Sequence, residues 1–242
     1  MSRLAVLIDA ENAQLAILDG LLAEIAKIGT ASVKRVYGDF TSPALAPWRE
    51  QLLAHSIQPI QQFRNTAHKN ASDSALIIDA MDLLHSKRFD GFCIVSSDSD
   101  FTRLASRIRE EGLLAYGYGE RKTPTSFVAA CDKFTYTEVL RAPAKGRSAP
   151  PAVRKEALVE NSELMRHLVD AAESCANESG WAPLGNVGSV VANHLPEFDP
   201  RHYGFKKLSA LVEATGLFEL QKRGSGDSLS LYVKLKPAPA SR

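Results

Sequence analysis

Aspartates follow two short apolar runs of this sequence, and another aspartate opens a third segment. Asp9 comes directly after the apolar run that ends at Ile8, and Asp98 and Asp100 come shortly after a second run. Asp73 stands at the start of a stretch with helical periodicity. Groups of carboxylates suit Mg²⁺ or Mn²⁺, which bind one or two carboxylates together with water and substrate phosphate. The four aspartates are therefore predicted to be catalytic metal ligands that act on a phosphodiester.

Three further polar residues are predicted to support these acids: Asn12, Asp79 and Ser96. Asp79 lies about 240° round the helix from Asp73, at about 100° per residue. It is therefore either a supporting acid or, with Asp82, part of a solvated face. For one acid taken alone, the commoner role of Asp near a helix start is to cap that helix. The metal site is favoured because four acids are expected to converge at one place, the edge of the predicted sheet where ligands bind.

Short β-branched runs alternate with stretches of helical periodicity over the N-terminal part, a pattern typical of βαβ units and a parallel sheet. Strands are predicted at 4–8, 33–37, 57–61, 92–96, 113–118 and 134–136. Helices are predicted at 13–28, 44–55, 74–85, 101–111 and 125–131. In a doubly wound sheet of order 3-2-1-4-5, the first and fourth strands are central neighbours, and ligands bind at their carboxyl ends. That order brings Asp9 beside Asp98 and Asp100.

The composition changes after residue 140, and this change divides the chain into two predicted domains. Residues 1–140 are expected to form a Rossmann-like α/β domain, followed by a flexible basic linker rich in Pro and Ala at 141–159. The C-terminal domain is expected at 160–236, with helices at 163–179, 187–194 and 203–215 and strands at 218–221 and 229–235. Three helices followed by a hairpin predict a small winged-helix domain.

The composition is typical of a soluble globular protein, with 45% hydrophobic and 24% charged residues. The net charge of +1 conceals local differences, because the first 140 residues carry 15 basic and 17 acidic side chains. Any polyanion must therefore be bound by local basic groups. The three cysteines are far apart and form no C-x-x-C motif, which disfavours a disulfide scaffold or a zinc finger. The short apolar run near the N-terminus predicts neither a signal peptide nor a membrane span, and hence a cytoplasmic protein.

Several common catalytic motifs are absent from the sequence. No G-x-G-x-x-G follows the first predicted strand, and neither G-x-x-x-x-G-K-[ST] nor G-x-S-x-G occurs. The six histidines show no H-E-x-x-H spacing. These absences disfavour a nicotinamide or flavin enzyme, a P-loop nucleotidase, an α/β-hydrolase and a zinc metalloprotease.

Three motifs in order resemble the NYN domain of bacterial LabA-like proteins. They are Leu7-Ile8-Asp9-Ala10-Glu11-Asn12, the segment from Lys69 through Asp73 to Met81, and Val95-Ser96-Ser97-Asp98-Ser99-Asp100-Phe101. The resemblance spans about residues 1–140 and implies a PIN-like fold related to metal-dependent ribonucleases. It implies further that Asp9, Asp73, Asp98 and Asp100 form the metal site and that Asn12 supports the first acid.

The C-terminal segment is similar to an OST-HTH (LOTUS) domain. The similarity lies chiefly in Phe198-Asp199-Pro200-Arg201-His202-Tyr203-Gly204-Phe205-Lys206-Lys207-Leu208. It covers about residues 160–236 and implies a winged-helix module that binds RNA or, in some members, protein partners. An NYN domain joined to such a module implies a nuclease directed by an RNA-binding domain.

Seven basic residues are predicted to contact a nucleic-acid substrate: Arg64, Lys69, Arg103, Lys206, Lys207, Lys222 and Arg223. Lys69 is the leading candidate for a phosphate contact, because it lies just before Asp73. In the C-terminal domain, Lys206 and Lys207 are expected early in the recognition helix. The neighbouring Tyr203 either stacks on a base or, as is commoner for this spacing, packs in the core. Lys222 and Arg223 are expected at the tip of the wing.

The leading interpretation is a metal-dependent endoribonuclease that uses Mg²⁺ or Mn²⁺ and has a C-terminal winged helix as its RNA-targeting module. One alternative is an RNA-binding regulator without catalysis, and another is an adaptor whose winged helix binds a protein partner. A DNA substrate is also compatible with the acids, because nothing among them distinguishes the 2′-hydroxyl of RNA. Salt-sensitive RNA binding would argue against the adaptor, because phosphate contacts weaken steeply with salt.

Overall fold

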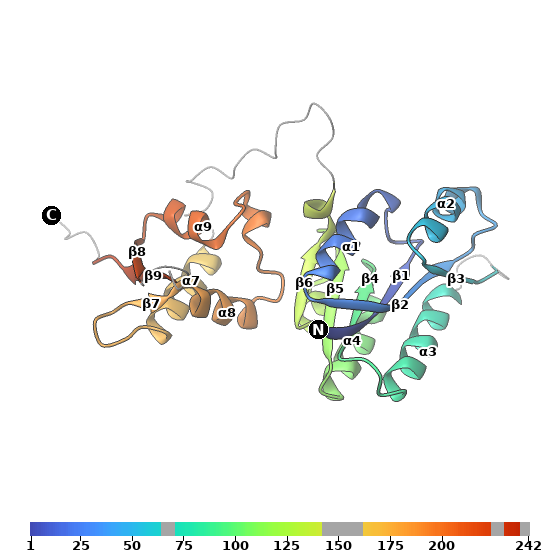
Figure 1. Cartoon of the computed structure of the whole chain (residues 1–242), viewed down its shortest axis with the longest axis horizontal. Coiled ribbons are helices and arrows are strands. Elements are labelled where there is room, and N and C mark those ends of the chain that lie inside the picture. Colours follow the sequence, from blue (N-terminus) through green and yellow to red (C-terminus); the bar gives the residue numbers. More distant parts are fainter. Residues whose placement is uncertain (64–70, 142–161, 224–229, 238–242) are drawn as a thin grey trace, which may run out of the picture. The chain divides into compact units, whose positions relative to one another are not determined.

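The computed structural model describes residues 1–63, 71–141, 162–223 and 230–237. The chain divides into two compact units, Met1–Ala142 and Pro143–Arg242, and each unit is described by itself (Figure 1). The linker predicted at 141–159 lies outside the described residues, apart from Arg141. Within the described ranges, no helix is both long and apolar enough to cross a membrane.

A six-stranded sheet forms the centre of the first unit, in the order β3-β2-β1-β4-β5-β6. Its strands are β1 (Ser2–Asp9), β2 (Gly29–Gly38), β3 (Gln58–Gln61), β4 (Gly91–Val95), β5 (Leu114–Gly119) and β6 (Lys133–Tyr136). All neighbouring strands are parallel. The predicted α/β fold is confirmed, and the predicted strand order is present with a sixth strand added at one edge.

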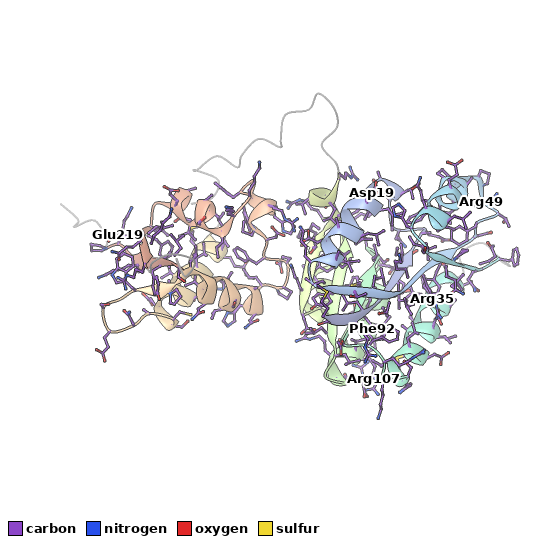
Figure 2. All side chains as sticks on the ribbon, viewed as in Figure 1. Asp19, Arg35, Arg49, Phe92, Arg107 and Glu219 are labelled. Carbon is purple, nitrogen blue, oxygen red and sulfur yellow. The ribbon has the colours of Figure 1, made fainter. Side chains whose placement is uncertain are left out.

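Helices cover both faces of this sheet, because parallel strands need crossover connections. The α-helices are α1 (Leu18–Ala26), α2 (Ala46–Ala54), α3 (Ala71–His85), α4 (Thr102–Glu110) and α5 (Thr125–Ala130). Short 3₁₀ segments are η1 (Leu15–Ile17), η2 (Pro43–Leu45), η3 (Ser99–Phe101) and η4 (Thr137–Leu140). One core contains residues of α3, α4 and α5, and the other contains residues of α1 and α2. Phe92 of β4, labelled in Figure 2, is fully buried in the first of these cores.

The sequence of β1 explains how one strand serves both layers. Ala5 and Leu7 belong to the core that contains α3 and α4, whereas Val6 and Ile8 belong to the core that contains α1 and α2. All four residues are completely buried. A central parallel strand covered on both faces requires this continuous apolar run. The run ends at Asp9, which is thereby positioned at the carboxyl edge of the sheet.

The largest differences from the predicted elements of the first unit lie at residues 13–33. The helix predicted at 13–28 is divided into η1 and the shorter α1, and β2 begins at Gly29 instead of residue 33. The sequence pattern treats Gly29 as the end of a helix, but this glycine pairs with Ser2 of β1. A Cβ atom at position 29 would lie 2.5 Å from the carbonyl oxygen of Ser2. Close approach of the two strands therefore explains the glycine.

The second unit combines helices with a three-stranded antiparallel sheet of order β7-β9-β8. Its elements are α7 (Ser162–Ser174), β7 (Ala182–Pro183), α8 (Leu184–His194), η5 (Pro200–Tyr203), α9 (Leu208–Thr215), β8 (Phe218–Arg223) and β9 (Ser230–Leu235). Leu168, Val191, Leu211 and Val233 meet in one core. The predicted winged-helix architecture is confirmed, and the short strand β7 is an addition that the sequence analysis missed.

The helix predicted at 203–215 is interrupted before α9. Gly204 has a φ of 82°, a left-handed conformation that ends η5. Lys207 is extended, with φ −142° and ψ 148°, and α9 begins at Leu208. Lys206 and Lys207 therefore precede the helix instead of lying within it, and both are exposed.

Candidate metal centre

The acids predicted from the sequence lie at the carboxyl edge of the parallel sheet. Asp9 is the last residue of β1, and Asp98 precedes η3 directly after the neighbouring strand β4. Asp100 lies within η3, and Asp73 lies in the first turn of α3. The sheet order reverses between β1 and β4, which is where open α/β sheets bind their ligands.

Three of these acids form a compact group. One carboxylate oxygen each from Asp73, Asp98 and Asp100 lies within 4.8 Å of the others. Asp73 is 8% exposed, whereas Asp98 is partly buried and Asp100 is exposed. The group is therefore buried at one end and open to solvent at the other, an arrangement that can hold a cation in contact with a ligand.

Asp9 lies behind this group with a different set of contacts. Its Oδ1 accepts hydrogen bonds from the backbone N–H groups of Glu11 at 3.0 Å and Asn12 at 3.3 Å. Its Oδ2 accepts from Asn12 Nδ2 at 2.8 Å and from Ser96 Oγ at 2.8 Å. These four bonds use the four acceptor positions of a carboxylate. Burial nevertheless raises the pKa of Asp9, although all four hydrogen bonds act to lower it.

Burial and the neighbouring acids together raise the pKa of Asp73 to about 7. Burial is the largest cause, followed by the negative charges of Asp9, Asp98, Asp100 and Glu11. Each pKa unit corresponds to about 1.4 kcal/mol of preference for the neutral form. An ionised Asp73 is therefore costly at this position, and a bound cation would remove that cost.

Two serines connect the strand ends that carry the acids. Ser96 Oγ donates to Asp9 and accepts from the backbone N–H of Asp98 at 3.1 Å. Ser97 Oγ accepts from the backbone N–H of Glu120, just beyond β5, at 2.8 Å. The side chain of Asp98 accepts from the backbone N–H of Asp100 at 2.9 Å. Asp98 therefore caps η3, the role that the sequence left open for it, while its carboxylate also belongs to the acidic group.

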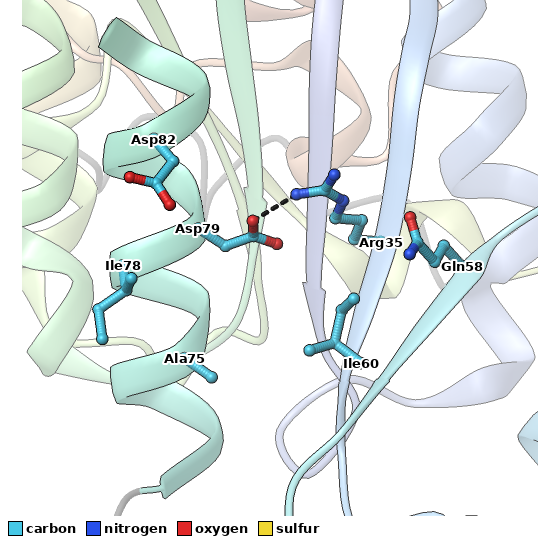
Figure 3. A pocket seen from close by; sticks show the side chains of 7 residues that line it. All are labelled: Arg35, Gln58, Ile60, Ala75, Ile78, Asp79 and Asp82. Carbon is cyan, nitrogen blue, oxygen red and sulfur yellow. Dashed lines mark hydrogen bonds and ion pairs between the residues drawn. The ribbon is translucent and has the colours of Figure 1, made fainter. Parts of the chain in front are cut away.

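Asp79 contacts different residues from those expected of a supporting acid. Its carboxylate forms an ion pair with Arg35 and accepts a hydrogen bond from Tyr37 Oη at 2.5 Å. Burial and the neighbouring Asp79 raise the pKa of Tyr37. Figure 3 shows Asp79 of α3 and Arg35 of β2 pointing toward each other. Both residues line an open depression of about 450 Å³. Asp79 thus joins α3 to β2, and Asp82 also lines this depression.

The predicted substrate-binding residues are spread over several elements, and two of them lie outside the described residues. Arg64 and Lys69 lie outside the described residues. Arg103 of α4 forms an ion pair with Glu110 at 3.3 Å. Lys222 and Arg223 end β8.

Two residues near the acids were not predicted as site residues. Glu11 contributes to the raised pKa of Asp73, and Ser97 anchors the loop that carries Asp98. Glu11 could have been found from its position two residues after Asp9. The contact of Ser97 with Glu120 joins residues 23 positions apart in the sequence, and no local pattern indicates it.

Solved structures from three bacteria are similar to parts of this chain. A protein of unknown function from Vibrio parahaemolyticus is 19% identical with a TM-score of 0.46, and the match covers 55% of this chain and 91% of that one. An uncharacterized protein from Nitrosomonas europaea is 31% identical with a TM-score of 0.32, over 42% of this chain and 92% of that one. A protein fragment from Chromobacterium violaceum is 32% identical with a TM-score of 0.29, and the match covers 34% of this chain and 90% of that one. No curated protein matches the chain significantly.

Two domain families match the sequence. The NYN domain matches residues 3–139, and the OST-HTH/LOTUS domain matches residues 160–230. The first match covers more than half of the chain and includes the acidic group at the sheet edge. The chain therefore belongs to the NYN domain family, and an OST-HTH/LOTUS domain follows its NYN domain.

Proposed function

We propose that this protein is a metal-dependent endoribonuclease, with the OST-HTH/LOTUS domain as its RNA-targeting module. The observation that carries the proposal is the group of three carboxylate oxygens within 4.8 Å at the ligand-binding edge of an NYN domain. The likeness of NYN domains to PIN-like, metal-dependent ribonucleases supports the same class of reaction. A hydrolase of this kind breaks the phosphodiester bond by the attack of water.

The acidic group has the donor chemistry of a Mg²⁺ or Mn²⁺ site. All three donors are carboxylate oxygens, and at Mg–O distances of about 2.1 Å the ligands of an octahedral Mg²⁺ lie about 3.0 Å apart when adjacent and about 4.2 Å apart when opposite. Small side-chain rotations would therefore let Asp73, Asp98 and Asp100 hold one ion. When bound, such an ion activates water as a nucleophile and stabilises negative charge on the phosphodiester.

The remaining residues orient this group and bind the substrate. Asp9, held by Asn12 and Ser96, keeps the loop of Asp98 in place through the hydrogen bond from the Asp98 backbone N–H to Ser96 Oγ. Lys69 and Arg64 precede Asp73 in the sequence and are proposed to bind the phosphate. In the second domain, the proposed RNA contacts are Lys206, Lys207, Lys222 and Arg223. Asp79 is not required for this chemistry, because it contacts Arg35 and Tyr37.

The decisive experiment follows the cleavage of end-labelled single-stranded RNA in Mn²⁺ and in Mg²⁺. Asp98→Asn and Asp100→Asn are expected to lower the rate roughly 100-fold or more, because several kcal/mol of transition-state stabilisation depend on the ion. Asp82→Asn is the matched control, because Asp82 lies on α3 with Asp73 but outside the acidic group. It should cleave at the wild-type rate.

Two results would contradict the proposal. A double variant, Asp98→Asn with Asp100→Asn, that cleaves as fast as the wild type would show that the acids are not catalytic. RNA binding in EDTA without cleavage in either metal would favour the non-catalytic regulator. The deoxyribonucleotide version of the same strand, tested in parallel, measures the preference for RNA over DNA.

A further inference from the structure

The antiparallel sheet of the second unit has one face that does not belong to the core. Successive side chains of a strand point to opposite faces, and Phe218 and Val233 are buried on the inner face. Gln221 pairs with Tyr232 across β8 and β9. Arg223 therefore lies on the outer face, diagonal to Tyr232. Glu219, labelled in Figure 2, belongs to the same outer face.

Arg223 stacks on two aromatic rings at this outer face. Its guanidinium carbon lies 4.6 Å from the ring centroid of Trp181 and 5.0 Å from that of Tyr232. Its Nε also donates to Gln221 Oε1 at 2.9 Å. The two aromatic side chains are partly exposed. We call Trp181, Arg223 and Tyr232 the aromatic–arginine stack.

A tight turn fixes Trp181 in this stack. Asn177 Oδ1 accepts from the backbone N–H groups of Ser179 and Trp181, both at 3.1 Å. The backbone of Asn177 also donates to the Trp181 carbonyl at 2.9 Å. Gly180 has a φ of 78°, a conformation that glycine adopts without strain. The turn therefore holds the indole in place before any ligand arrives.

The charges around the stack favour an anionic ligand. Arg223 and Lys234 lie on the outer face, and the exposed Lys236 directly follows β9. Lys234 Nζ donates to the carbonyl of Ser179, in the turn before Trp181, at 3.0 Å. Among the described residues of β8 and β9, the acid on this face is Glu219, which pairs with Lys234. On the described part of this face two cations, Arg223 and Lys234, thus accompany one carboxylate, although residues 163–242 as a whole carry nine basic and nine acidic side chains.

We propose that the aromatic–arginine stack binds an unpaired base of single-stranded RNA, with the neighbouring lysines contacting its phosphates. Unpaired bases bind proteins by stacking on aromatic rings and on arginine guanidinium planes, and basic residues beside them hold the backbone. The proposal deepens the proposed function, on which it rests, by assigning the RNA contact of the targeting domain to its sheet. Duplex RNA, whose bases are paired and stacked, lacks this contact.

The alternative stacking residue, Tyr203, lies in a less suitable environment. Tyr203 packs against the hydrophobic core of the unit, and its ring centroid lies 6.5 Å from that of Phe198. This contact is the core role that the sequence left open for Tyr203. The sheet face therefore offers the better stacking site.

Tryptophan fluorescence tests the proposal directly in the full-length protein. The chain has two tryptophans, and Trp48 is 3% exposed in the first unit, so a stacked base is expected to quench Trp181 selectively. Unlabelled single-stranded RNA is titrated in EDTA, which prevents metal-dependent cleavage. The wild type should show saturable quenching that weakens with salt, and Trp181→Phe should leave the remaining emission unchanged. The same strand annealed to its complement should quench little.

Variants separate stacking from charge. Trp181→Ala and Tyr232→Ala are each expected to weaken binding, measured by anisotropy of a labelled strand, roughly 5- to 150-fold. Arg223→Lys keeps the charge and should preserve the salt dependence while losing part of the affinity. Arg166→Gln is the matched control, because Arg166 is an exposed arginine on α7. The RNA affinity of this variant should fall by much less than that of Arg223→Gln.

The outcomes are unambiguous once folding is checked by thermal unfolding. Tyr232→Phe keeps the ring and should bind as the wild type does, and Arg223→Gln and the quenching measurement keep the proposal testable if the alanine variants unfold. Unchanged RNA affinity in folded Trp181→Ala and Arg223→Gln variants, or RNA binding without quenching, would overturn the proposal and leave the stack as internal support for the sheet. Because these measurements need no metal, their failure is distinguishable from a failure of the nuclease activity.

Discussion

Asp73 is the residue at which burial and negative charge oppose each other most directly. It is nearly buried at the start of α3 and lies close to two other carboxylates. Its pKa of about 7 lies well above the ordinary value of 3.8. Near neutral pH Asp73 is therefore protonated in about half of the metal-free molecules, and a bound cation would displace that proton.

The stability of the metal-free protein should fall as pH rises between about 4 and 7. Over this interval the folded state binds more protons at Asp73 than the unfolded state does, because the pKa of Asp73 is raised on folding. Asp73→Asn removes the ionisation, and we expect it to raise the free energy of unfolding by about 1 to 3 kcal/mol near pH 8. Near pH 4 the same variant should change little.

Urea unfolding in EDTA across this pH range measures the effect. Asp82→Asn, on the same helix, should show no such pH dependence. A stabilisation by Asp73→Asn that is equal at both ends of the range would mean that Asp73 is not the group that titrates.

At the scale of elements, α3 connects the acidic group to strand β2 of the sheet. Its first turn carries Asp73, and further along the helix Asp79 bonds to Arg35 and Tyr37 of β2. β2 is itself paired with β1, which carries Asp9. The ion pair thus sets the position of α3 on the sheet and, through it, the position of one acid.

We expect Asp79→Ala to lower the free energy of unfolding by about 1 to 3 kcal/mol, because Arg35 and Tyr37 then lose a charged partner. Asp82→Ala should change it by less than about 0.5 kcal/mol. Mn²⁺ binding, measured by calorimetry under conditions where both variants are folded, should remain near the wild-type value in each. If Asp79→Ala instead weakened Mn²⁺ binding without loss of stability, Asp79 would be the supporting acid that its sequence position first indicated.

At the scale of the whole molecule, two compact units have separate cores. The acidic group belongs to the first unit and the aromatic–arginine stack to the second. Binding of a ligand to the folded form of one unit raises the stability of that unit by mass action.

We therefore expect two calorimetric unfolding transitions, of which Mn²⁺ raises one. At a free Mn²⁺ concentration of about 100 times its dissociation constant, the free energy of unfolding of that unit rises by about 2.7 kcal/mol. Asp98→Asn with Asp100→Asn should abolish the shift, and Arg223→Gln should leave it unchanged. An equal shift of both transitions would contradict the assignment of the ion to the NYN domain.

The sequence predicts most of the fold because the determining signals are local. Apolar runs of strand length and helical periodicity identify every strand of the first unit, and the acids directly after β1 and β4 mark its functional edge. Errors arise where a distant contact determines a local conformation. Gly29 begins a strand because it must approach Ser2, and β7 is two residues long and exists through its pairing with β9.

The sequence by itself determined the two domain types, the strands of the first unit and the set of acids that belong to the carboxyl edge of its sheet. Tertiary structure alone decided that Asp73 joins Asp98 and Asp100 while Asp9 lies behind them, saturated with hydrogen bonds. It also decided that Asp79 joins α3 to β2 through Arg35 and that Arg223 stacks on Trp181. The physical reason is that a residue's type and its neighbours in sequence fix its chemistry and its element, whereas its partners depend on which strands and helices pack together.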